Sequence, residues 1–284
     1  MTQFQTIDVD KVKLHYAEAP GPGPALVFLH GITGSHTDFL PFMPMLAKQA
    51  HIYALDLRGH GLSDQTPGTY QVADYGRDVV AFLRTVVGRP AIIAGFSLGG
   101  LVGAWIAGQT PDLIQKLFLE EPALYIIQMP RFKESIFYGY FTTLREHLPQ
   151  HHAAGGTLDD MIAYVGAFPV TEEHTMIEIA GPEIVRERAI QGHQMDPTTF
   201  DPFIEGVLLD GQDADDLLEK IRCPVHLMAG QMALGGALSP EDVQRAISKL
   251  SDCTYTVVED VGHGIHQDRP EEYCQALQQF LSAA

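Results

Sequence analysis

The sequence predicts an α/β protein with a doubly wound, mostly parallel sheet of eight strands, interrupted by a helical insertion. Short apolar runs alternate with longer helix-like segments at both ends of the 284-residue chain. This alternation stops between residues 122 and 212 and then resumes. Because each pair of parallel strands needs a crossover, the alternation predicts helices on both faces of the sheet.

The predicted elements follow from periodicity and from glycine and proline breaks. An early hairpin is expected at 4–9 and 13–18. The other strands are expected at 25–29, 51–55, 91–94, 115–119, 225–229 and 254–258. Helices are expected at 38–49, 73–87, 98–109, 240–250 and 270–281.

The insertion, residues 122–212, is predicted to be a helical cap, with the core domain formed by 1–121 and 213–284. Helical signals in it lie at 132–148, 158–168, 173–190 and 200–209, with Gly155-Gly156 and Gly181-Pro182 as breaks. We expect the cap to cover the carboxyl ends of the strands, where open α/β sheets bind ligands.

Composition limits the classes of molecule that the protein is expected to bind. The chain has 36 acidic and 18 basic residues, a net charge of −18, which repels polyphosphate and anionic membranes and argues against nucleic acid and membrane partners. No signal peptide or membrane-spanning run is readable, so a cytoplasmic location is expected. Cys223, Cys253 and Cys274 are expected to be reduced thiols, and no spacing predicts a metal or cofactor. A small-molecule substrate is the expected partner, and a homo-oligomer is kept as an alternative to a monomer.

The segment Gly95-Phe96-Ser97-Leu98-Gly99 is a GxSxG pattern between a predicted strand and a predicted helix. This context is typical of a nucleophile elbow, in which a sharp turn exposes the serine hydroxyl. Glycines are needed there because larger side chains would clash with the neighbouring strand and helix. We therefore predict that Ser97 is a nucleophile.

Two further turns supply the groups that such a nucleophile requires. His30 to Ser35 form a small-residue turn after the strand at 25–29, and the backbone N–H groups of Ile32 and Leu98 are predicted to bind an oxyanion. Gly262-His263 follows the last strand, and His263 is predicted to be the base that takes the Ser97 proton. His266 is the competing histidine.

Together with Asp56 to Ser63, these motifs occur in an order that resembles the α/β-hydrolase superfamily, in particular its cap-bearing ester, lactone, epoxide and C–C hydrolases. The resemblance covers nearly the whole chain and implies the α/β-hydrolase fold. It implies a structural role for the Asp56 to Ser63 segment. The serine at position 97 argues against the haloalkane dehalogenase and epoxide hydrolase branches, whose nucleophile is an aspartate.

The chain departs from this family at the acid of the triad. The Gly-x-x-Asp pattern usual after the strand that follows the cap is replaced by Ala229 to Gly236, which contains no carboxylate. The family's alternative position is the end of the strand before the cap, where this chain has Glu120-Glu121-Pro122. A glutamate there resembles the arrangement in zearalenone-type lactonases.

Side-chain alternation sends Glu120 and Glu121 to opposite sides of the sheet, so one of them should reach His263. Glu121 is predicted to do so because it lies past the strand end and Pro122 is expected to keep it extended. Glu120 is the alternative, and Asp242 or Asp260 would supply the acid if both glutamates are structural.

These inferences predict a cofactor-independent serine hydrolase that cleaves a carboxylic ester or lactone through an acyl-enzyme intermediate. An apolar or aromatic substrate group is expected because the cap is rich in aromatic and methionine residues. A C–C bond hydrolase or an acyltransferase on the same triad is one alternative. The other is a ligand-sensing protein with a vestigial hydrolase site. The cap residues concerned are Tyr125, Met129, Phe132, Phe137, Tyr138, Tyr140, Phe141, Met161, Tyr164, Phe168, Met176 and Met195.

Overall fold

The computed structural model describes residues 1–169 and 174–283 and contains one eight-stranded sheet. The strand order is β1-β2-β4-β3-β5-β6-β7-β8, and only the pairs β1–β2 and β2–β4 are antiparallel. The predicted fold class is therefore confirmed. The strands are β1 (Gln3–Val9), β2 (Val12–Ala19), β3 (Ala25–Leu29), β4 (His51–Leu55), β5 (Ala91–Phe96), β6 (Ile114–Glu120), β7 (Val225–Ala229) and β8 (Cys253–Val257).

Strands β5 and β6 extend beyond their predicted carboxyl ends. Gly95 pairs with Leu119, and Phe96 pairs with Glu120. As a result, Ser97 directly follows the paired segment of β5, and Glu121 directly follows that of β6. The register thus places two residues that carry chemistry at the same edge of the sheet.

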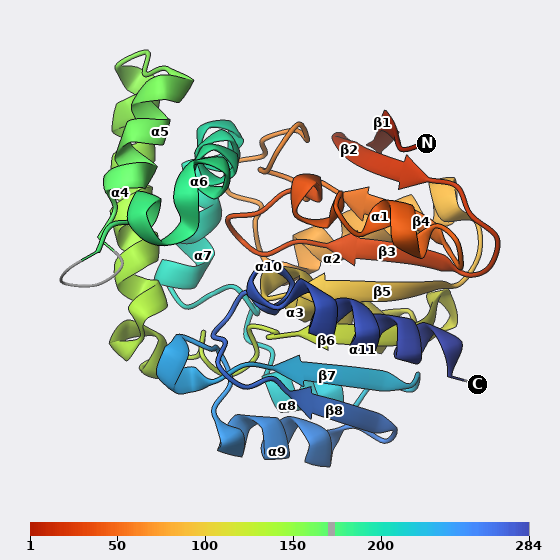
Figure 1. Ribbon diagram of the computed structural model, residues 1–284. Coiled ribbons are helices and arrows are strands. Elements are labelled where there is room, and N and C mark those ends of the chain that lie inside the picture. Colours follow the sequence, from red (N-terminus) through yellow and green to blue (C-terminus); the bar gives the residue numbers. More distant parts are fainter. Residues whose placement is uncertain (170–173, 284) are drawn as a thin grey trace.

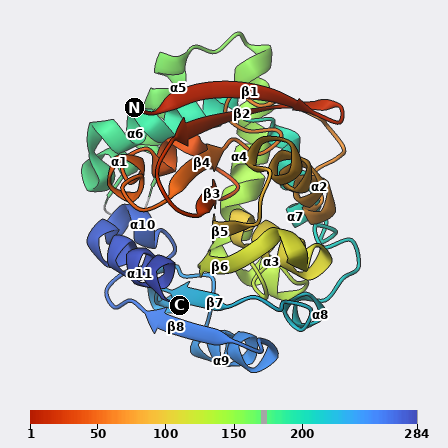
Figure 2. The ribbon, with the colours of Figure 1, turned by 90° about the vertical axis from the view of Figure 1, so that its right-hand side faces the viewer.

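Helices cover both faces of the sheet, and Figure 2 shows the two layers from the end of the sheet. One layer contains α1 (Met43–Leu46), α10 (Ile265–Asp268) and α11 (Pro270–Ser282); the other contains α2 (Val72–Phe82), α3 (Leu98–Gln109) and α8 (Ala214–Leu218). The last helix of the core, α9 (Pro240–Lys249), packs beside β8. The apolar interior is correspondingly divided into two buried clusters, one on each face.

The segment 122–212, between β6 and β7, carries a further set of helices. Its helices lie beyond the arrowheads of the parallel strands in Figure 1, so they cover the carboxyl edge of the sheet. They comprise α4 (Ile136–Ala153), α5 (Leu158–Ala167), α6 (Met176–Gln194) and α7 (Asp201–Ile204), with 3-10 turns η4 (Arg131–Glu134) and η5 (Pro197–Phe200).

Several helix predictions need correction. The segment 38–49 is not one helix but a 3-10 turn, η1 (His36–Phe39), followed by the short α1 with Pro44 near its start. Proline has no N–H to continue a helix that begins before it. By contrast, the predicted break at Gly181-Pro182 is present, because Gly181 has a φ of 79° and interrupts α6. Glu173, the predicted start of that segment, lies outside the described residues.

Smaller irregular elements complete the described chain. They are a π-helical turn after α2, η2 (Leu83–Val87), and the 3-10 turns η3 (Pro111–Leu113) and η6 (Met232–Leu234). The short helices α8 and α10 were not predicted. Among the described helices, none combines the length and the apolarity needed to cross a membrane.

Candidate active site

Ser97 occupies a strained turn between β5 and α3. Its φ is 51° and its ψ is −111°, a conformation that L-residues rarely adopt. A Cβ on Gly95 would lie 2.4 Å from the carbonyl oxygen of Gly99, and one on Gly99 would lie 2.0 Å from that of Leu29. Both distances are far below van der Waals contact, so this turn requires glycine on each side of the serine.

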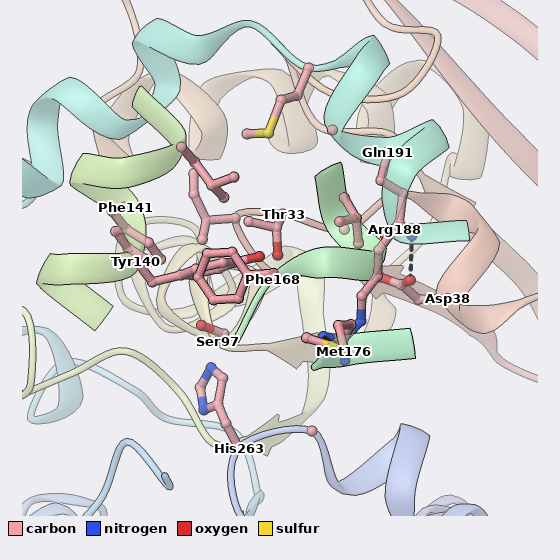
Figure 3. Close-up of a pocket in the computed structure, with 18 of the residues that line it drawn as sticks. Thr33, Asp38, Ser97, Tyr140, Phe141, Phe168, Met176, Arg188, Gln191 and His263 are labelled. Atoms are coloured by element: carbon pink, nitrogen blue, oxygen red, sulfur yellow. Dashed lines mark hydrogen bonds between the residues drawn. The ribbon is translucent and has the colours of Figure 1, made fainter. Parts of the chain in front are cut away.

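The backbone of Ser97 is held by the neighbouring strand. Its N–H donates to the carbonyl of Glu120 at 3.0 Å, and its carbonyl accepts from the N–H of Ala123 at 3.1 Å. In the described structure its hydroxyl makes no hydrogen bond, and it faces the same cavity as the His263 ring (Figure 3). Nucleophile and base often make loose contacts until substrate binds.

His263 is paired with Glu121. Its Nδ1 lies 3.1 Å from Oε2 of a glutamate that is fully buried, whereas the His263 side chain is 21% exposed. The Glu121 carboxylate also accepts the N–H of Gly230 at 2.8 Å and the N–H of Ala237. Two backbone N–H groups that follow β7 therefore hold the carboxylate against the histidine.

The backbone of Glu121 differs from the prediction. Its φ is 44°, so the expectation that Pro122 keeps this residue extended is wrong. The Glu121 N–H donates to the carbonyl of Met228 at 2.8 Å, which extends the β6–β7 pairing by one bond. That bond and the amides around the carboxylate offset the cost of the left-handed conformation.

Glu120 points to the other side of the sheet, as the alternation of side chains requires. It accepts the backbone N–H of His266 at 2.7 Å and contacts Nδ1 of the same residue at 2.9 Å. Burial alone would lower the pKa of His266, but the adjacent Glu120 carboxylate outweighs it and raises this pKa. Glu120 is thus occupied by His266.

The other two acidic residues considered from the sequence make contacts elsewhere. Asp242 forms an ion pair with Arg131 and accepts the N–H of Ser239 at 2.9 Å at the start of α9. Asp260 precedes the His263 turn, with a φ of 54°, and its carbonyl accepts from Arg269 at 2.9 Å. In the described residues the one carboxylate bonded to His263 is that of Glu121.

The two amides predicted to bind an oxyanion have no acceptor among residues 1–169 and 174–283. Leu98 begins α3, so its N–H is one of the unpaired donors at a helix start. His60 contacts the turn next to the Ile32 N–H, because its Nε2 lies 2.6 Å from the Ile32 carbonyl oxygen. This contact ties the Asp56 to Ser63 segment to the turn beside the serine.

His30 fixes the same turn from below. Its Nε2 accepts the N–H of Leu57 at 3.0 Å, so its Nδ1 carries the proton and donates to the Gly31 carbonyl at 2.7 Å. Burial, reinforced by the nearby His60, lowers the pKa of His30 to about 3. The ring therefore stays neutral near pH 7 and keeps this pair of bonds.

A cavity of about 250 Å³ opens above Ser97 and His263, bounded by the insertion. Most of the aromatic and methionine residues singled out in the sequence line it, whereas Tyr125, Met129, Phe132 and Tyr138 do not. A polar group formed by Asp38, Arg188 and Gln191 lies at one side of it (Figure 3). The lining aromatic and methionine residues are Phe137, Tyr140, Phe141, Met161, Tyr164, Phe168, Met176 and Met195.

One described group has the residue types of a metal site. Ligand atoms of His15, His36 and Asp56 lie within 4.8 Å of one another, and all three residues are buried. The Asp56 carboxylate already takes both histidine Nδ1 atoms, at 2.8 and 2.9 Å, and the N–H groups of His36 and Leu62. Although burial alone would raise it, these bonds hold the pKa of Asp56 well below its usual range. The three side chains therefore form a hydrogen-bonded cluster that joins β2, η1 and the turn after β4.

The sequence model described as "Alpha/beta hydrolase family" matches residues 26–276, which includes both strands that flank the insertion. The chain belongs to the alpha/beta hydrolase family. This membership agrees with the sheet order and with the position of the serine turn.

Individual proteins resemble this alpha/beta hydrolase in part or in fold. The 2-(acetamidomethylene)succinate hydrolase of Mesorhizobium japonicum is 35% identical over 120 residues, 42% of this chain and 43% of that protein, so the match spans less than half of the relative's length. A crystal structure of E-2-(acetamidomethylene)succinate hydrolase superposes with a TM-score of 0.76, at 22% identity over all of both chains. The enol-lactonase of Burkholderia xenovorans has a TM-score of 0.76, at 19% identity over 98% of this chain and 100% of that one.

The sequence alone did not reveal the polar residues of the cavity. Asp38 and Gln191 are 153 positions apart and come from η1 and α6, and their hydrogen bond of 2.7 Å exists only in the folded chain. A glutamine and an arginine in a predicted helix look like ordinary surface residues. The one available signal was their position in the segment predicted to cover the strand ends.

Proposed function

We propose that this alpha/beta hydrolase is a serine hydrolase that cleaves a carboxylic ester or lactone through an acyl-enzyme intermediate. The observation that supports the proposal most is the 3.1 Å contact between His263 Nδ1 and the buried Glu121 Oε2. His263 lines the same cavity as Ser97, which lies in a strained turn. Nucleophile, base and orienting acid then come from three separate segments at one edge of the sheet.

In this mechanism Ser97 Oγ attacks the substrate carbonyl carbon while His263 Nε2 takes the hydroxyl proton. The carbonyl oxygen becomes an oxyanion, and the N–H groups of Ile32 and Leu98 donate to it. His263 then returns the proton to the leaving oxygen, which departs as an alcohol or, from a lactone, remains attached to the acyl chain. Water attacks the acyl-enzyme with the same base and releases the acid.

Glu121 is proposed to orient the imidazole. With its proton on Nδ1 facing Glu121, His263 presents an unprotonated Nε2 to the serine. The carboxylate also stabilises the imidazolium that forms during attack. The Gly230 and Ala237 amides donate one bond to each of its oxygens, so it does not need to turn away toward water.

The cavity supports a compact substrate with an apolar or aromatic portion. About 250 Å³ is a small volume for a ligand cavity, and apolar side chains, several of them aromatic, contribute much of its wall. Since the partial relative is a 2-(acetamidomethylene)succinate hydrolase, amides belong in any substrate screen beside esters and lactones.

The test is a hydrolysis screen over esters, lactones, amides and β-diketones of graded acyl size. Wild type is compared with Ser97→Ala, His263→Ala and Ser248→Ala, the last being an exposed serine on α9. We expect ester or lactone hydrolysis that the first two variants lose and the third retains. Cleavage of ketones alone would replace the proposal with C–C bond hydrolysis, and no turnover of any class would favour a ligand sensor.

A further inference from the structure

Arg188 brings a positive charge to the wall of an otherwise largely aromatic cavity. It extends from α6 and is half-buried. Its guanidinium donates to the sulfur of Met176 at 3.5 Å and to Oε1 of Gln267 at 3.5 Å, and the second distance is at the outer limit for a hydrogen bond to oxygen. A thioether is a weak acceptor. Arg188 therefore has donors directed into the site without a strong partner for them.

No carboxylate of the described residues forms an ion pair with Arg188. Two other arginines of the insertion are paired, Arg131 with Asp242 and Arg145 with Asp201. The chain has twice as many acidic as basic residues, 36 against 18, so the lack of an acidic partner for Arg188 among the described residues is not explained by a shortage of carboxylates.

The acid in the cavity wall is used in another way. Asp38 accepts from the Gln191 amide at 2.7 Å and from the Ser35 N–H at 3.3 Å. Burial raises the pKa of Asp38 to about 6, against the opposing effects of His266 and Gln191. Asp38 is thus engaged by Gln191 and Ser35 and forms no ion pair with Arg188, which leaves the guanidinium available to a ligand.

The position of Arg188 relates it to the reaction centre. Gln267, which it contacts, belongs to α10, directly after the turn that carries His263. In Figure 3 Arg188 and Met176 lie beside the space above Ser97 and His263. A ligand group on the guanidinium and a carbonyl at Ser97 would occupy the same small cavity.

We propose that Arg188 is a specificity residue that binds a carboxylate on the substrate, which makes the substrate an ester or lactone of a short dicarboxylic acid. This inference rests on the proposed function. A guanidinium matches a carboxylate with two parallel N–H···O bonds, and such charged pairs are stronger than neutral ones. The local cation overrides the repulsion that the net charge of −18 exerts on anions at long range.

The kinetic test uses monomethyl and dimethyl esters of succinate, glutarate and adipate. For each acid, kcat/KM of the half-ester is divided by that of the diester. Wild type should prefer a half-ester, and Arg188→Met should lower this ratio about 10- to 100-fold, mainly through KM, because one charged hydrogen-bonding pair is lost. Arg188→Lys keeps the charge without the planar fork and should fall between the two.

Arg186→Met is the matched control, because Arg186 is on the same helix and is exposed. It should leave the ratio unchanged. A binding arm is independent of turnover: in the Ser97→Ala background, glutarate titrated by calorimetry should bind at least tenfold more weakly when Arg188→Met is added, but not when Arg186→Met is added.

The outcomes separate the two proposals. If Arg188→Met and Arg186→Met change the ratio equally, or if glutarate binds the double variants alike, the carboxylate assignment is overturned while ester hydrolysis still supports a serine hydrolase. If glutarate binding depends on Arg188 but no ester, lactone or half-ester is hydrolysed, the anion site stands and the proposed function fails.

Discussion

Glu120 and Glu121 are adjacent in the chain but bind different histidines on opposite sides of the sheet. Glu121 contacts His263 at 3.1 Å, beside the cavity, and Glu120 contacts His266 at 2.9 Å, within the buried layer of α10 and α11. Both contacts join residues more than a hundred positions apart, at separations of 142 and 146. The last residue of β6 and the one after it therefore anchor two parts of the same C-terminal loop.

This division predicts different effects for two otherwise similar substitutions. Glu121→Gln should lower kcat about a thousandfold, because an amide can donate to His263 Nδ1 and favour the wrong tautomer. The factor by which Glu120→Gln lowers kcat should be at least ten times smaller than that for Glu121→Gln. Glu120→Gln should instead reduce the free energy of unfolding by about 1–3 kcal/mol, because it weakens a buried charged bond. Steady-state kinetics and urea unfolding of both variants check this. Equal losses of kcat would contradict the assignment of the acid.

The glycine turn around Ser97 predicts a contrast between two Gly→Ala variants. Gly99→Ala should destabilise the protein by about 2–3 kcal/mol, since the new Cβ meets the Leu29 carbonyl oxygen at 2.0 Å and the backbone has to move. Gly139→Ala should instead stabilise it by up to about 1 kcal/mol, because Gly139 lies in α4 and its Cβ would meet nothing within 4 Å. Thermal and urea unfolding measure both. A stable, active Gly99→Ala protein would contradict the described turn.

The oxyanion assignment predicts that Gly31→Ala impairs activity more than stability. A Cβ there would lie 2.8 Å from the Phe96 ring and 3.4 Å from Ser97 Cβ, so the ring and the Ile32 peptide are pushed from their positions. Loss of one oxyanion donor typically lowers kcat 100- to 1,000-fold. We expect kcat to fall by about that factor with KM little changed. A variant with wild-type kcat would remove Ile32 from the mechanism.

Burial of Asp38 predicts a pH dependence of stability. The pKa of Asp38 is about 6 in the folded protein, above the ordinary value near 3.8, so the folded state holds the proton more tightly. The resulting penalty is absent below pH 4, grows as pH rises to 6 and is fully present above it. The charged groups that influence Asp38 are His266, which opposes this shift, and Glu187, which reinforces it.

Asp38→Asn removes the titration but keeps an acceptor for Gln191. The unfolding free energy of the variant minus that of wild type should therefore rise by about 2 kcal/mol between pH 4 and pH 7. Urea unfolding at several pH values measures this difference. A difference that is constant with pH would show that Asp38 ionises normally in the folded protein.

The sequence predicted the parts of the fold that depend on local patterns. The bounds of β3, β4, β7 and α3 agree with the structure because apolar runs and glycine or proline breaks delimit them. Period-two alternation also separated Glu120 from Glu121. The broken helix at 38–49 was missed because its prolines were outweighed by the surrounding apolar pattern, whereas the break at Gly181-Pro182 was predicted from its residues.

What the sequence could not supply depends on distant partners. The left-handed conformation of Glu121 is held by Met228, Gly230 and Ala237, which lie across the entire insertion from it. The same holds for the bond between Asp38 and Gln191. Such contacts have no periodic signal, so the contact of Glu121 with His263 could be predicted but the way the carboxylate is held could not.

The central claim is that Ser97 is a nucleophile activated by His263 and Glu121. The most direct measurement is the rate of covalent labelling by a fluorophosphonate, with the adduct mapped by mass spectrometry. We expect one adduct, on the peptide that contains Ser97, and no adduct in Ser97→Ala. In Glu121→Gln we expect labelling at least tenfold slower than in wild type. Labelling of Glu121→Gln at the wild-type rate, or no adduct on Ser97 in the wild-type protein, would contradict it.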